Sequence, residues 1–136
     1  MILKKLEEKL EEKYLTEFKL SEEFLKIAKI NSNLSFRSSA NRLYFSFEKA
    51  VISYLLFKKL KVPKNHQKMW ELCSEFLGEE YYTHLRKLYD LRMQGDYGNI
   101  SVFVMLTKLT LQENITKTEN LINKIRGKLG LFTKSE

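Results

Sequence analysis

Apolar residues recur along this chain at the three- and four-residue spacing typical of helices. The clearest series lies near the C-terminus, where five apolar residues and one threonine would form a single packing stripe on a long helix at residues 101–128: Leu111, Ile115, Thr118, Ile122, Ile125 and Leu129. With one proline and five glycines, the chain has few residues suited to hairpin turns. We therefore expect an all-α fold.

The same pattern divides the chain into five predicted helices, at about residues 2–30, 35–60, 66–77, 79–95 and 101–128. Ser21 is followed by two acidic residues, which is typical of a helix N-cap and first turn. Residues 2–13 would then form either a separate helix or the first part of a continuous one. A chain of 136 residues can bury one core but not two, which predicts a single domain spanning residues 1–136.

The predicted helix at 35–60 is apolar around most of its circumference, so it would be central in the bundle or shared with a second subunit. Its one narrow face expected to meet water holds Arg42, Ser46, Lys49 and Ser53. Another strip carries Asn41, Tyr44 and Glu48 at i, i+3 and i+7. A buried Glu48 would need a partner, for which Arg92 is the candidate. Alternatively, Glu48 lies at the edge of this strip and its carboxylate reaches water.

Positive charge is concentrated in one part of the chain. The formal net charge is +7, and residues 33–68 account for all of it, with eight basic residues against the single acid Glu48. The eight are Arg37, Arg42, Lys49, Lys58, Lys59, Lys61, Lys64 and Lys68. Such a field attracts polyanions such as nucleic acids. The alternative is a solvated, lysine-rich face that serves solubility.

Polar residues also gather where the predicted fourth helix ends. Arg92 and Asp96 stand four residues apart on one face, followed directly by Tyr97. They can form a helix-terminal ion pair and no more. Alternatively, Arg92 presents its planar fork of donors to a phosphate, with Asp96 holding it and Tyr97 acting as a proton donor or stacking group. His66, after the basic loop, is either a helix-start residue or a further member of such a site.

Other chemistry is disfavoured. A single cysteine, Cys73, excludes an internal disulfide, and with only two histidines a structural zinc site is not expected. We predict no metal and no cofactor. The longest apolar runs are far shorter than a membrane span, and the N-terminus alternates Lys and Glu, unlike a signal peptide. These features predict a cytoplasmic protein.

Three segments together resemble the HEPN domains of prokaryotes. They are the run from Phe36 to Ser46, Pro63 with His66, and the series Leu88, Leu91, Arg92, Asp96 and Tyr97. The likeness is to the branch whose fourth helix ends in an Arg followed by an Asp-Tyr pair, and it covers about residues 20–128. It implies an up-and-down bundle of four to five helices, with residues 1–14 as a helical extension.

The resemblance also implies a homodimer in which the polar ends of the second and fourth helices line a shared cleft. Family members include metal-independent ribonucleases, many of them toxins paired with a minimal nucleotidyltransferase antitoxin, and others that bind RNA or nucleotides. Nuclease members carry a His a few residues after the Arg, and here Tyr97 holds that place. Tyrosine, with a pKa of about 10, is a poor base near neutral pH.

Three functions therefore stand as expectations. The first is a dimeric module that binds RNA or a nucleotide through Arg37, Arg42, Lys49, Lys64 and Arg92, with Asn41, Tyr44, Glu48 and Asp96 as a supporting polar network. The second is a metal-independent endoribonuclease that uses Arg92 with Tyr97 or His66. The third is a structural protein that docks a partner through an N-terminal stripe of Leu3, Leu6 and Leu10.

Overall fold

The computed structural model describes residues 2–100 and 104–131, and its regular elements there are five α-helices. They are α1 (Ile2–Asn31), α2 (Phe36–Phe57), α3 (His66–Phe76), α4 (Glu79–Tyr97) and α5 (Lys108–Lys128). The predicted all-α bundle is confirmed. None of these helices is long and apolar enough to cross a membrane.

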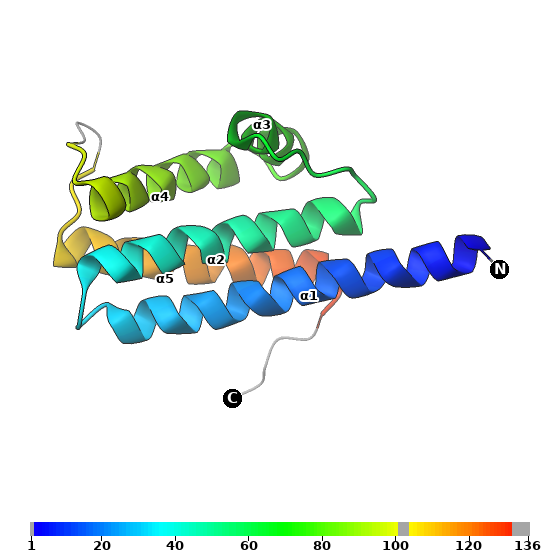
Figure 1. The fold of residues 1–136 in the computed structure, drawn as a ribbon, viewed down its shortest axis with the longest axis horizontal. Coiled ribbons are helices and arrows are strands. Elements are labelled where there is room, and N and C mark those ends of the chain that lie inside the picture. The colour runs from blue at the N-terminus through cyan, green and yellow to red at the C-terminus, as the bar shows by residue number, and fades with distance from the viewer. Residues whose placement is uncertain (1, 101–103, 132–136) are drawn as a thin grey trace.

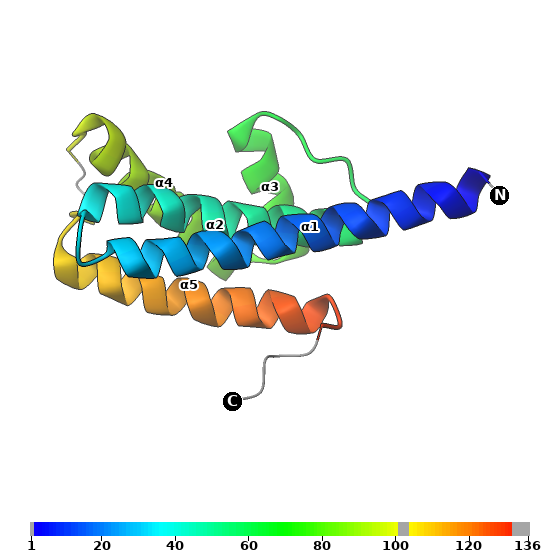
Figure 2. The same ribbon diagram turned by 60° about the horizontal axis from the view of Figure 1, so that its bottom comes forward.

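The four long helices run up and down beside one another, and the short α3 lies across them (Figures 1 and 2). The start of α2 and the end of α4 meet at one end of the bundle. α2 packs against all four other helices. It is the central helix because its apolar residues face several neighbours at once, and Leu43, Phe47, Val51 and Leu55 are fully buried.

α1 is one continuous helix, so Ser21 does not begin a new one. Ser21 is buried, and its hydroxyl donates a 2.6 Å hydrogen bond to the carbonyl oxygen of Ser46 on α2. The expectation that Ser46 and Ser53 face water is wrong, because α1 covers this side of α2 and both serines are buried. Small side chains suit this position, since they allow two helices to pack closely.

The first turns of α1 extend beyond the end of α2 (Figure 1). Tyr14 makes the edge-on contact that marks this point, 5.2 Å from the ring centre of Phe57. Leu3 and Leu6 are exposed. The side chain of Leu10 lies outside the described residues. Docking of a partner on this stripe stays a prediction.

The last helix begins later than its pattern indicated. α5 starts at Lys108, and residues 104–107 are not helical. The predicted start at residue 101 lies outside the described residues. Thr107 is the N-cap, and its hydroxyl accepts from the backbone N–H of Thr110. This capping box fixes the start of the helix. The predicted stripe is confirmed, because its six residues are all buried: Leu111, Ile115, Thr118, Ile122, Ile125 and Leu129.

Candidate phosphate-binding site

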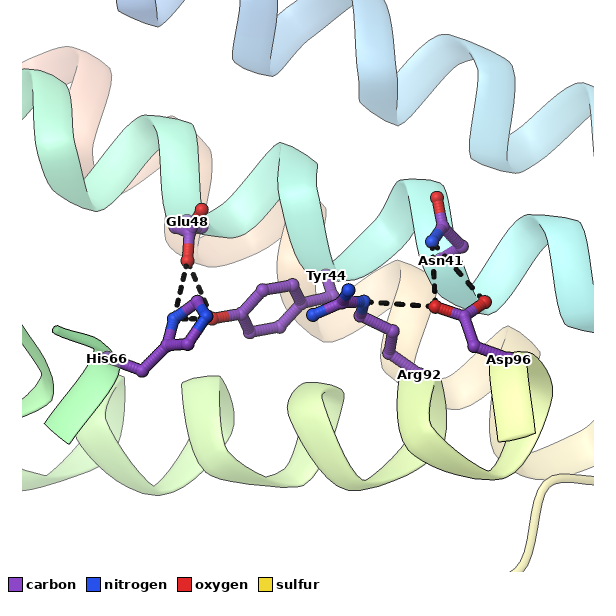
Figure 3. Close-up of polar contacts among 6 residues, drawn as sticks. All are labelled: Asn41, Tyr44, Glu48, His66, Arg92 and Asp96. Atoms are coloured by element: carbon purple, nitrogen blue, oxygen red, sulfur yellow. Dashed lines mark hydrogen bonds and ion pairs between the residues drawn. The ribbon is translucent and has the colours of Figure 1, made fainter. Parts of the chain in front are cut away.

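A polar cluster joins α2 to the end of α4. The Nδ2 of Asn41 donates to the carboxylate of Asp96, at 3.0 Å from Oδ2 and 3.4 Å from Oδ1. The Nε of Arg92 donates to the same Oδ2 at 3.1 Å. Asp96 therefore holds Arg92 from one side and is itself held by α2 (Figure 3).

Aromatic rings support the guanidinium of Arg92 on its other sides. Its central carbon lies 4.7 Å from the ring centre of Phe45, 5.5 Å from that of Tyr44 and 5.8 Å from that of Tyr89. Only Nε is bonded to Asp96, and the two terminal nitrogens have no hydrogen-bond partner among the described residues. Arg92 is thus oriented, about one-sixth exposed and able to donate to an anion.

A second polar group lies beside the first, on the far side of the Tyr44 ring (Figure 3). The hydroxyl of Tyr44 donates a 2.7 Å hydrogen bond to Oε2 of Glu48. The Nδ1 of His66, at the start of α3, lies 3.4 Å from the same Glu48 oxygen and 3.4 Å from the Tyr44 hydroxyl. Burial and the adjacent carboxylate raise the pKa of Tyr44, so its hydroxyl remains a donor at neutral pH.

The expected pair between Glu48 and Arg92 is not found in the described part of the chain. Glu48 is buried and takes Tyr44 and His66 as partners, whereas Arg92 takes Asp96. Sequence spacing placed Asn41 and Glu48 on one strip correctly, but they lie two turns apart along α2. Asn41 faces the last turn of α4, whereas Glu48 faces the start of α3, so each residue has a different partner.

The family model for the HEPN domain matches residues 17–128 of this chain. The chain belongs to the HEPN domain family. No curated protein matches it. The match covers the end of α4, both polar groups and all of α2 and α3, and it begins within α1, after the first turns that extend beyond α2.

Two of the predicted phosphate-binding residues of this HEPN domain lie on another face of α2. Lys49 forms a 3.0 Å ion pair with Glu17 on α1, and the Arg42 guanidinium lies 5.4 Å from the ring centre of Phe24, also on α1. Both residues are engaged with α1. The eight basic residues of the 33–68 segment therefore do not share a single face with Arg92.

The remaining predicted basic residues lie at opposite ends of α2. Arg37 is exposed in the first turn of α2, one helical turn before Asn41. Lys64 is exposed in the loop before α3, two residues before His66. The structure thus brings Arg37 close to the Asn41 end of the site and Lys64 close to the His66 end.

Tyr97, at the end of α4, is 66% exposed and has no hydrogen bond within the described part of the chain. The second histidine of the HEPN domain, His84, is buried instead. Its Nε2 lies 2.7 Å from the Thr118 hydroxyl, and the edge of its ring meets Phe47. Burial, reinforced by nearby Lys87, lowers the pKa of His84 to about 3, so it is neutral and structural.

Two aromatic members of the site were not predicted from the sequence. Tyr89 lies one turn before Arg92 on α4, and its ring touches those of Tyr44, His66 and Trp70. The i, i+3, i+7 spacing of Tyr89, Arg92 and Asp96 could have shown that the three share a face. Phe45, whose ring lies nearest the guanidinium, gave no such signal, because its position on α2 reads as ordinary core.

The described residues contain no group of three or more His, Cys, Asp or Glu side chains that could hold a metal ion. Cys73 is buried, and burial raises the pKa of its thiol to about 12. This thiol is therefore inert near neutral pH.

Proposed function

We propose that this HEPN domain binds RNA, or a nucleotide, by donating hydrogen bonds from Arg92 to a phosphate. The observation that carries the proposal is the Arg92 guanidinium. It is fixed by Asp96, supported by three aromatic rings, and its two terminal nitrogens are unbonded among the residues that the structure describes. Bidentate Arg–phosphate pairs are strong and directional, and they gain from preorganisation of the guanidinium.

The proposal is tested by measuring the affinity for a fluorescent single-stranded RNA of mixed sequence at several salt concentrations. Arg92→Ala should weaken binding at least tenfold. It should also reduce the slope of log affinity against log salt by roughly 0.7, as expected for one lost phosphate contact on a single strand.

Arg86→Ala is the matched control. Arg86 is exposed on the same helix, packs over Trp70 and Tyr82, and carries the same charge. Its removal should change the affinity by less than about twofold. Equal losses in the two variants would show that only net charge matters, and would overturn the assignment to Arg92.

A metal-independent endoribonuclease is the second candidate function. The observation in its favour is the contact of His66 Nδ1 with Glu48 and Tyr44. A histidine whose Nδ1–H is held by a carboxylate leaves Nε2 as an acceptor, and Nε2 could then take the proton of a ribose 2′-hydroxyl. Arg92 would stabilise charge on the phosphate in the transition state. Tyr97, which is largely exposed, would serve as the acid or orient the substrate.

Cleavage of mixed RNA in EDTA distinguishes the two functions. An enzyme should lose at least a hundredfold in rate with His66→Gln and with Arg92→Ala, while Gln67→Ala, on the next residue, should keep the wild-type rate. A protein that retains RNA but cuts none of it would exclude the ribonuclease and leave the binding module.

We further propose a homodimer and a minimal nucleotidyltransferase as partner, both on the strength of family membership. Light scattering at several protein concentrations tests the dimer. Co-expression with a minimal nucleotidyltransferase tests the pair. Repeating this experiment with a chain that begins at residue 15 tests whether the exposed Leu3 and Leu6 bind that partner. Co-purification of the full chain but not of the shortened one would favour docking through α1.

A further inference from the structure

A pocket of about 550 Å³ lies where the α1–α2 turn meets the end of α4. This volume is within the range of small-molecule sites. Its lining combines apolar, amide and guanidinium side chains: Asn33, Leu34, Phe36, Arg37, Gln94, Gly98, Asn99 and Leu106. None of the described residues that line it is acidic. A pocket of similar size over α4 and α5, in contrast, is lined by three glutamates and two lysines, so it does not favour an anion.

The pocket adjoins the Arg92 cluster through the contact between α2 and α4. A Cβ on Gly95 would lie 3.1 Å from the Cα of Arg37, so the two backbones touch here. Arg37 precedes Asn41 by one helical turn, about 5.4 Å along α2. Asn41 in turn holds Asp96, the partner of Arg92. The pocket therefore begins about one turn of α2 from Asn41, the residue that holds the partner of Arg92.

One wall of the pocket is fixed. The Nε2 of Gln94 donates to the Val104 carbonyl at 2.6 Å, and its Oε1 accepts from the Leu106 N–H at 2.9 Å. Both ends of this amide are thus used to hold the segment before α5 against α4. The pocket wall needs no rearrangement to be formed, which favours ligand binding.

The other polar groups are free to contact a ligand. The side chains of Asn33, Asn99 and Arg37 make no hydrogen bond or ion pair within the described residues. Beside them lies Phe36, whose side chain is 38% exposed. An exposed aromatic ring, a guanidinium plane and unpaired amides are the groups with which proteins stack and hydrogen-bond the unpaired bases of RNA.

We propose that this pocket binds one unpaired nucleobase of an RNA strand whose adjacent phosphate is held by Arg92. The base stacks on Phe36 and Arg37, and the amides of Asn33 and Asn99 contact its edge. This inference rests on the proposed function and assigns a base subsite to it.

The test uses two probes of equal length: a single-stranded RNA and a ribose-phosphate oligomer without bases. Affinities are measured for the full chain and for Phe36→Ala, with Leu109→Ala as the matched control. Leu109 is also an exposed apolar residue in the first turn of a helix, but it does not line the pocket. Phe36→Ala should weaken RNA binding at least fivefold and leave the base-free oligomer unchanged, because a base–aromatic stack is lost but no phosphate contact is. Leu109→Ala should change neither.

The outcomes separate the subsite from the function on which it rests. If Arg92→Ala weakens both probes and Phe36→Ala weakens neither, the phosphate site stands and the base subsite is overturned. If Arg92→Ala has no effect on either probe, the proposed function itself fails. Asn33→Ala, outside the helices, provides a second variant that spares folding. This variant should reduce the ratio of the affinities for oligo(A) and oligo(U) at least threefold. An unchanged ratio would argue against base recognition by the Asn33 amide.

Discussion

Asn41 donates hydrogen bonds to both carboxylate oxygens of Asp96, although 55 residues separate the two in the sequence. This contact ties the first turns of α2 to the last turn of α4. Since Arg92 donates to the same carboxylate, the position of its guanidinium depends on the packing of the two helices as well as on its own helix. Asp96 can thus act on a bound phosphate in two opposite ways, by orienting Arg92 or by repelling the anion.

Asp96→Ala distinguishes these two roles. We expect a loss of RNA affinity of about threefold to tenfold, equivalent to roughly 0.7–1.4 kcal/mol, because the guanidinium loses the hydrogen bond that orients it. The measurement is the binding titration used for Arg92→Ala. If Asp96 acted only through its charge, the variant would bind RNA more tightly than the wild type.

A second prediction concerns the place where α2 and α4 touch. Gly95→Ala adds a Cβ at 3.1 Å from the Arg37 backbone, so the helices must separate by a few tenths of an ångström. We expect the free energy of unfolding to fall by about 1–2 kcal/mol, despite the better helix propensity of alanine. Urea denaturation measures this change.

Gly127→Ala is the matched control, because Gly127 also lies within a helix and a Cβ there meets no atom of the described residues within 4 Å. This substitution should raise the free energy of unfolding by about 0.5 kcal/mol. If both glycine variants were stabilised alike, the close approach of Gly95 to Arg37 would not constrain the helices.

The sequence predicted the helices well and their contacts less well, for a physical reason. Periodicity reports which side of a helix is apolar, so the buried stripe of α5 could be read directly. It does not report what covers a polar side. The pattern predicted that Ser46 and Ser53 face water, yet both are buried under α1. Burial is possible because each hydroxyl donates a hydrogen bond to the carbonyl oxygen three residues before it in the same helix.

The site shows the same division. The ion pair of Arg92 and Asp96 could be predicted from their i, i+4 spacing, since both residues lie on one helix. The partners of Glu48 could not, because they depend on where the chain between α2 and α3 places His66. Phe45 and Gln94 gave no local signal, and their roles come from contacts across elements.

The close packing of α1 on α2 gives a third prediction. Ser46→Leu places a large side chain at a position that is fully buried under α1. Overpacking of this kind should lower the free energy of unfolding by about 1–3 kcal/mol. Thr16→Leu, at an exposed position of α1, should change it by less than about 0.5 kcal/mol. Thermal and urea unfolding of the two variants check this, and similar values for both would contradict the burial of Ser46 by α1.

His84 should make stability depend on pH. Its pKa is lowered to about 3 in the folded chain, first by burial and then by Lys87 and Lys117, with Glu80 acting in the opposite direction. Between about pH 6.5 and pH 3 the unfolded chain therefore binds a proton that the folded chain does not. Above pH 6.5 His84 is neutral in both states and does not lower the free energy of unfolding. As the pH falls below 6.5 the free energy of unfolding decreases, by about 2 kcal/mol at pH 5.

The measurement is urea unfolding between pH 7.5 and pH 5 for the wild type and two variants. His84→Gln cannot take up this proton. The difference in free energy of unfolding by which it falls short of the wild type should therefore shrink by about 2 kcal/mol over that range. Thr118→Val removes the 2.7 Å contact with His84 but keeps the imidazole. The loss in its free energy of unfolding relative to the wild type should therefore stay nearly constant with pH. A His84→Gln chain that lost stability as steeply as the wild type would show that His84 is not held neutral in the folded state.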